Sequence, residues 1–170
     1  MHRPIALCAL ASMCAVAFGC GDDDPPPPAN VAGDYTISVT NDENACMLAD
    51  WTVGETTTNI PLTITQSGTA INGSITGLAG AWFDVVVGVH DFDEGSVVGN
   101  NITLTMHGTR AYNSGGCTAT LQVDAAGTLM GDVLQGELRY SFNTNGSAEC
   151  GVLNTCFNTA RFNGTRPPSL

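Results

Sequence analysis

The seven cysteines are the residues of this chain with the clearest chemical potential. Three lie near the N-terminus, and four are spread over the rest of the chain: Cys46, Cys117, Cys150 and Cys156. An even number of thiols in an exported domain is typical of disulfides, whereas zinc sites usually contain cysteine pairs separated by roughly two to four residues. The closest of these pairs, Cys150 and Cys156, has five residues between its members. We therefore predict two disulfides and no metal site.

The two histidines beyond the N-terminal region are the candidate acid–base groups. His90 opens the acidic stretch HDFDEGS, residues 90–96, which resembles a fragment of a calcium-binding loop but lacks the further ligands and the terminal bidentate glutamate. We interpret it as a solvated hairpin turn. His107 lies on a different predicted strand, and neither histidine has a neighbour in sequence that would make it a general base. We expect no catalytic site, no enzyme activity and no cofactor.

The N-terminus carries a pattern that indicates export and attachment. A basic head ending at Arg3 precedes an uncharged apolar run over residues 5–17, as in secretory signals, and the run is too short to span a bilayer. The sequence Ala-Phe-Gly-Cys at residues 17–20 resembles the lipobox of bacterial lipoproteins. The resemblance implies cleavage before Cys20, diacylation of its sulfur and anchoring in the bacterial cell envelope. Gly21 follows the cysteine where aspartate would signal inner-membrane retention, so the resemblance favours the outer membrane.

The segment after Cys20 is built as a spacer, and the rest of the chain is acidic. Three aspartates and four prolines, residues 22–28, predict a semi-rigid extended tether. All five basic residues are arginines, so loss of Arg3 with the signal leaves four against sixteen acidic residues. Phosphate backbones require Lys and Arg, which argues against nucleic-acid binding. The same net negative charge disfavours electrostatic attraction to anionic lipids, so we expect the acyl chains to anchor the protein to the membrane.

From residue 32 onward the hydrophobic pattern has period two, with threonines on the alternate face. Segments such as YTISV and ITLTMH alternate apolar and polar residues, which is typical of half-buried antiparallel strands. Small and φ-permissive residues at 66–69, 90–99 and 125–128 predict the turns. We predict eight strands, at about residues 34–40, 59–66, 70–76, 82–89, 100–107, 117–123, 130–142 and 157–164.

The expected fold is all-β, an antiparallel up-and-down barrel of about eight strands, with a two-sheet sandwich as the alternative. In a barrel the longer loops near residues 41–58, 77–81, 108–116 and 143–156 share one rim, and all four paired cysteines fall there. Closure of the last strand on the first favours Cys46–Cys156 with Cys117–Cys150. The pairing Cys150–Cys156 with Cys46–Cys117 stays open.

The stretch GDYTIS, residues 33–38, opens the first predicted strand with a Gly-x-aromatic motif. In this motif and in architecture the domain resembles the lipocalin-like and avidin-like barrels. That resemblance implies a barrel that carries one small hydrophobic ligand. Trp51 and Trp82 fall near the loop-rich rim, where we interpret them as rim packing, with the lining of an opening as the alternative.

The predicted organisation is a lipoprotein signal peptide at 1–19, a lipidated Cys20 with an Asp/Pro-rich tether at 20–32, an all-β domain at 33–166 and a tail at 167–170. The leading hypothesis is a membrane-tethered structural or protein-binding lipoprotein with the loop-rich rim as its contact surface. The alternative is a carrier of a small hydrophobic ligand. The two differ in one property, because a carrier needs an emptiable cavity and a scaffold does not.

Overall fold

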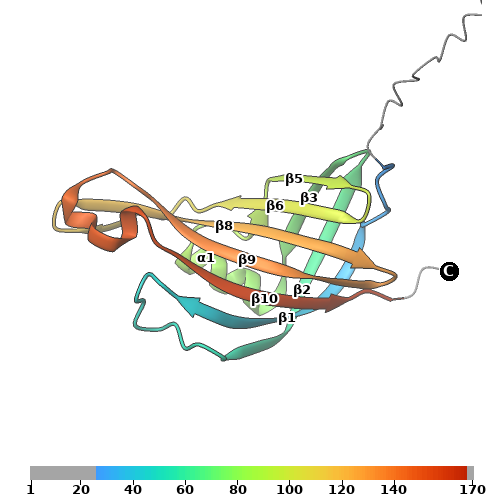
Figure 1. Ribbon diagram of the computed structural model, residues 1–170, viewed down its shortest axis with the longest axis horizontal. Helices are drawn as coiled ribbons and strands as arrows, with labels where there is room; N and C mark the ends of the chain where they lie inside the picture. The colour runs from blue at the N-terminus through green and yellow to red at the C-terminus, as the bar shows by residue number, and fades with distance from the viewer. Residues whose placement is uncertain (1–25, 168–170) are drawn as a thin grey trace, which may run out of the picture.

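Ten strands, one α-helix and one 3-10 helix make up the computed structural model, which describes residues 26–167 (Figure 1). In chain order the elements are β1 Gly33–Asn44, β2 Thr56–Ser67, β3 Ala70–Ile75, α1 Gly77–Val86, β4 Asp91–Phe92, β5 Glu94–Val98, β6 Asn101–His107, β7 Tyr112–Ser114, β8 Cys117–Met130, β9 Val133–Thr144, η1 Ala148–Asn154 and β10 Phe157–Thr165.

Eight of the strands form a closed antiparallel barrel. The order β2-β1-β10-β9-β8-β6-β5-β3 is completed by pairing of β2 with β3, so the sheet returns to its first strand. Two short strands lie beside this ring, β4 on β3 and β7 on β8. The predicted all-β barrel of about eight strands is confirmed, and its shape is consistent with a lipocalin-like architecture. The chain does not form the two-sheet sandwich.

Alternation along the strands places the apolar side chains inside the barrel. Tyr35 and Ile37 are buried on β1 with Thr36 exposed between them, and Ile102 and Leu104 are buried on β6 around an exposed Thr103. The pattern read from the sequence is therefore correct at these strands. The inner residues of all eight strands join in one hydrophobic cluster.

The predicted strand at 82–89 is wrong, because these residues belong mainly to α1 and the loop after it. The fourth barrel strand is instead β5, which overlaps the stretch predicted to be a solvated turn. This part of the chain contributes Phe92 and Val97 to the core, while its acidic side chains face outward. Gly80 lets α1 pack against the end of β3, since a Cβ there would lie 2.3 Å from the Ile75 carbonyl oxygen.

The predicted turn at 125–128 is also wrong. β8 continues without a break to Met130, and the chain reverses at residues 131–132. Gly127 and Gly136 face each other across β8 and β9, where a Cβ on Gly136 would lie 2.0 Å from the Ala126 carbonyl oxygen. The small residues that suggested a turn instead allow close approach of two neighbouring strands.

Residues 26–32 cross one end of the barrel, which we call the closed end. The Gln66 side chain accepts a hydrogen bond from the Val31 N–H at 2.7 Å, and the Tyr35 hydroxyl donates to the Val31 carbonyl at 2.8 Å. The Arg166 guanidinium lies 5.7 Å from the centre of the Tyr35 ring. Val31 itself is fully buried. The folded unit therefore includes residues that were predicted to belong to the tether.

The opposite end, which we call the open end, carries the longer connections and both disulfides (Figure 1). Cys46 bonds to Cys156 and Cys117 to Cys150, with Cα separations of 5.1 and 4.8 Å. This is the pairing favoured from strand order, and the alternative pairing does not form. Each disulfide fixes a long loop to the barrel rim. Within residues 26–167 no helix is long and apolar enough to cross a membrane.

Candidate functional site

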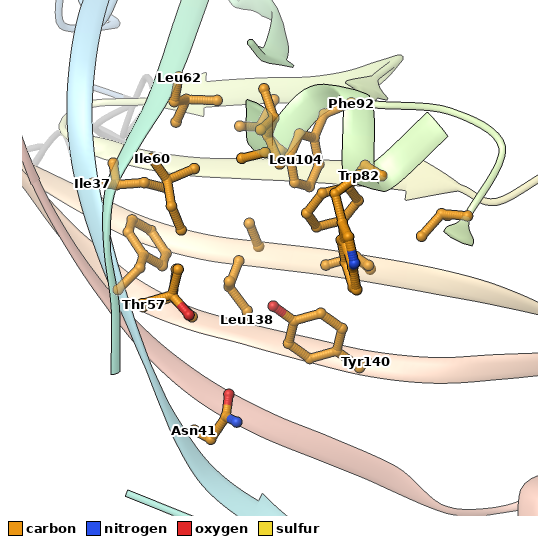
Figure 2. A pocket seen from close by; sticks show the side chains of 18 of the residues that line it. Ile37, Asn41, Thr57, Ile60, Leu62, Trp82, Phe92, Leu104, Leu138 and Tyr140 are labelled. Atoms are coloured by element: carbon orange, nitrogen blue, oxygen red, sulfur yellow. The ribbon is translucent and has the colours of Figure 1, made fainter. Parts of the chain in front are cut away.

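The barrel interior contains a cavity of about 480 Å³ that reaches the open end (Figure 2). Its walls come from the inner faces of the strands, from α1 and from the loop at residues 45–55. An eight-stranded barrel is just wide enough to be filled by side chains or to hold one small ligand. Here Ala125 occupies an inward position on β8, and α1 contributes Ala79, Phe83 and Val86 to the cavity wall. The interior is therefore only partly filled.

The cavity wall changes from apolar to polar toward the open end. On β1 the lining residues in order are Ile37, Val39 and Asn41, and on β9 they are Leu134, Leu138 and Tyr140. Figure 2 shows Asn41, Thr57 and Tyr140 grouped away from the apolar set of Ile60, Leu62, Leu104 and Phe92. A bound molecule would meet hydrocarbon at depth and polar groups near the mouth.

Two aromatic residues contact each other at the polar side of the cavity. The Trp51 indole packs edge-on against the Tyr140 ring with 5.0 Å between ring centres. The indole N–H of Trp51 is buried and has no hydrogen-bond partner among the described residues. Burial raises the pKa of the Tyr140 hydroxyl far above its ordinary value, so this phenol stays neutral and keeps its proton.

The helix α1 forms one wall of the mouth. Its residues Phe83 and Val86 line the cavity, and Trp82 also lines it while remaining 57% exposed. The outer face presents Leu78 and Val85 to solvent, 91% and 65% exposed. Apolar and aromatic side chains of one short helix thus border the entrance from inside and outside.

Contacts at its C-terminal end hold α1 to the barrel. The Asp84 carboxylate lies 2.7 Å from His90 Nδ1, and the Tyr112 hydroxyl donates to the Val86 carbonyl. The hydrogen bond to Asp84 raises the pKa of His90 above its ordinary value, with desolvation opposing it. Backbone N–H groups of residues 109 and 110 both donate to the Val87 carbonyl. Together with the packing of Gly80 against Ile75, these contacts hold α1 in place beside the cavity.

The charged groups of the lining are all acidic. Asp50 and Glu55 stand at the rim, and among the residues that the structure describes no arginine or histidine lines the cavity. The histidines considered from the sequence lie elsewhere: His90 pairs with Asp84, and His107 lies 3.9 Å from Glu94. Among residues 26–167 no group of three or more His, Cys, Asp or Glu side chains is arranged to hold a metal ion.

Trp51 and Trp82 both line the cavity, so the favoured interpretation of simple rim packing is incomplete and the alternative, that they line an opening, is correct. Tyr140, Asn41 and Ala125 line it as well but are not singled out by the sequence. Tyr140 shares the inward face of β9 with Leu138, so strand alternation alone could have found it. The expected lipid site, Cys20, lies outside the described residues.

The chain matches no known protein-family model, no curated protein and no solved structure.

Proposed function

We propose that this domain is a carrier that binds one small, mainly apolar molecule inside its barrel. The observation that carries the proposal is the apolar cavity of about 480 Å³. This volume falls within the range of about 300–1,000 Å³ that is usual for sites that enclose small ligands. A purely structural barrel gains from a filled interior, since close packing is the rule in protein cores. The cavity therefore favours the carrier over a packed scaffold.

The carrier is exported and attached through a diacyl group on Cys20. The disulfides Cys46–Cys156 and Cys117–Cys150 support an oxidising compartment, as such bonds are rare in the cytosol. At the closed end of the barrel the Ala29 N–H donates to the Gly99 carbonyl and Pro26 lies against Gly99, so a lipid on Cys20 would tether the protein from that end. The mouth of the cavity would then face away from the membrane. Ligand exchange would take place on the side open to the surrounding compartment.

A protein-binding role for the open end is the second candidate, and a separate observation favours it. Leu78, Trp82 and Val85 are exposed on one helix face, and Met47 and Val53 are exposed on the loop at residues 45–55. Apolar residues that gather on a surface commonly mark contact sites. This role is compatible with the carrier, since a partner that seats on the mouth could receive the ligand.

The first test is a ligand titration of the full-length protein extracted from bacterial membranes. Both tryptophans of the chain line the cavity, so a bound alcohol should change their fluorescence. Along a series of straight-chain primary alcohols, each added methylene should tighten binding by about fourfold until the cavity is full. Absence of any saturable response across the series would remove the carrier proposal.

The second test addresses the anchor. Intact-protein mass spectrometry should find a diacylated N-terminal cysteine in the extracted protein, and a Cys20→Ser variant should lack it. An unmodified chain cleaved at another residue would contradict the anchor. The ligand titration would still decide the carrier proposal independently.

A further inference from the structure

The polar side of the cavity offers hydrogen-bond donors. The Trp51 indole N–H is a donor only, and it is buried without a partner among the described residues. Native proteins seldom leave a buried donor unpaired, and such exceptions call for an explanation. Because this nitrogen has almost no accessible surface, a ligand oxygen would become its missing partner only after the indole shifts toward the cavity.

The Tyr140 ring packs against the Trp51 indole, and its hydroxyl projects into the cavity (Figure 2). Desolvation by the surrounding walls raises its pKa, so the hydroxyl carries a proton that it can donate. Two side chains that each carry a donor, Trp51 and Tyr140, therefore come from sequence-distant segments and pack together at the polar side of the cavity.

The charge of the lining excludes one large group of apolar ligands. Fatty acids and other carboxylates bring a negative charge that must be paired or solvated when it is buried. The rim provides Asp50 and Glu55, and within residues 26–167 no basic side chain lines the cavity. Three arginines of the barrel are engaged elsewhere: Arg161 with Asp42, Arg166 with Asp132 and Arg139 over the Phe157 ring.

We propose that the ligand is an uncharged amphiphile whose terminal oxygen accepts hydrogen bonds from Trp51 and Tyr140, and that carboxylates of the same length are rejected. Ketones, esters and alcohols have this chemistry. The apolar body of the ligand extends toward Leu104 and Phe92 at depth, and the oxygen stays near the mouth. This inference rests on the proposed carrier function and specifies the ligand class of the same cavity.

The experiment compares two ligands of equal length, 2-decanone and decanoate, by displacement of the neutral fluorescent probe N-phenyl-1-naphthylamine from the full-length protein. At pH 8 the ketone should bind at least tenfold more tightly than the carboxylate. The difference should narrow as the pH falls toward the pKa of the fatty acid, because the protonated acid is neutral. Equal affinity of the two ligands at pH 8 would overturn the inference.

Two variants test the donors while keeping aromatic rings at both positions. Trp51→Phe and Tyr140→Phe should each weaken 2-decanone binding by about threefold to tenfold, as expected for one lost neutral hydrogen bond. Glu137→Gln, on the outer face of β9, is the matched control and should bind like the wild type. Ketone affinity that is unchanged in both aromatic variants would overturn the assignment of the donors.

The results also separate this inference from the carrier function beneath it. If the wild-type protein binds neither the probe nor the ketone, the carrier proposal and the inference both fail. If the probe binds and the ketone and carboxylate compete equally, the carrier stands and only the ligand class is wrong. The comparison on the wild-type chain does not depend on whether the variants fold.

Discussion

Enlarging one side chain inside the barrel tests whether the interior holds an empty cavity or a filled core. Ala125 is an inward residue of β8, 6% exposed, and lines the cavity. Ala125→Leu adds three carbon atoms that would enter the cavity space. Burial of each carbon contributes about 0.8 kcal/mol at most, and filling a cavity commonly stabilises a protein by about 0.5–2 kcal/mol. We expect the variant to be more stable than the wild type by about 1–2 kcal/mol.

The control is the same substitution at an inward position that is already filled. Ala160 on β10 is fully buried and is not part of the cavity wall. Ala160→Leu should destabilise the protein by about 1–3 kcal/mol, because extra atoms in a packed core force its neighbours apart. The two variants add identical atoms to different strands of one barrel. Opposite changes in the free energy of unfolding would therefore reflect only the space available around each residue.

The assay is urea unfolding followed by circular dichroism with both disulfides intact, together with binding of the neutral probe. Ala125→Leu should raise the unfolding midpoint and weaken probe binding by at least about tenfold, since a pocket rejects a ligand that no longer fits. A loss of stability as large as that of Ala160→Leu would refute the reasoning. It would mean that the interior around Ala125 is packed and holds no ligand.

Three further predictions concern the elements that frame the cavity. Replacing Cys117 and Cys150 together by serine opens a loop of 33 residues, and urea unfolding should show a loss of about 2–4 kcal/mol; an unchanged midpoint would contradict the role of this disulfide. The hydrogen bond to Asp84 raises the pKa of His90 in the folded protein. The ion pair therefore stabilises the fold fully at a pH below the ordinary histidine pKa of about 6.5, and this stabilisation is lost as the pH rises through the raised pKa of His90. The melting temperature of His90→Gln should accordingly lie below that of the wild type at pH 5.5 and match it at pH 8.5, in a salt-sensitive manner because both groups are well exposed. Gly136→Ala places a Cβ 2.0 Å from a backbone oxygen of β8, so it should cost at least about 3 kcal/mol or prevent folding, and a fully stable variant would show that β8 and β9 can separate.

In the proposed carrier, the open end would serve both ligand exchange and contact with a partner. The apolar helix face at Leu78 and Val85 lies next to the mouth that Trp82 borders. Residues 26–32 lie at the opposite end, where the Gln66 side chain bonds to the backbone of Ala29 and Val31. A ligand would thus leave through the end that also carries the exposed apolar surface, at the greatest distance from the proposed anchor.

The sequence by itself determined the strand periodicity and the class of fold, and it favoured the observed disulfide pairing without excluding the alternative. Alternation is a local property: Ile37 faces inward and Thr36 outward because successive side chains of a strand point to opposite sides. Strand order then places the four cysteines at one rim, and only certain pairs can meet there. These features follow from short stretches of sequence and from chain connectivity.

The hydrophobic pattern gave the wrong secondary structure for two segments whose sequence is compatible with more than one element. Residues 82–89 are rich in apolar and β-branched side chains and resemble a strand, yet most of them lie in or just after α1, which packs through Gly80 against the end of β3. The acidic stretch at 90–96 resembles a turn, yet it supplies Phe92 to the core. In both cases contacts with distant strands outweigh the local preference.

The cavity was decided only by the tertiary structure. Its volume is the space that remains after all inward side chains of eight strands and one helix are placed, so no single segment specifies it. The contact of Trp51 with Tyr140 likewise exists only in the folded barrel, where a loop fixed by Cys46–Cys156 packs against a residue inside β9. Sequence pattern sets the direction in which a side chain points, whereas the room left between side chains depends on the packing of the whole barrel.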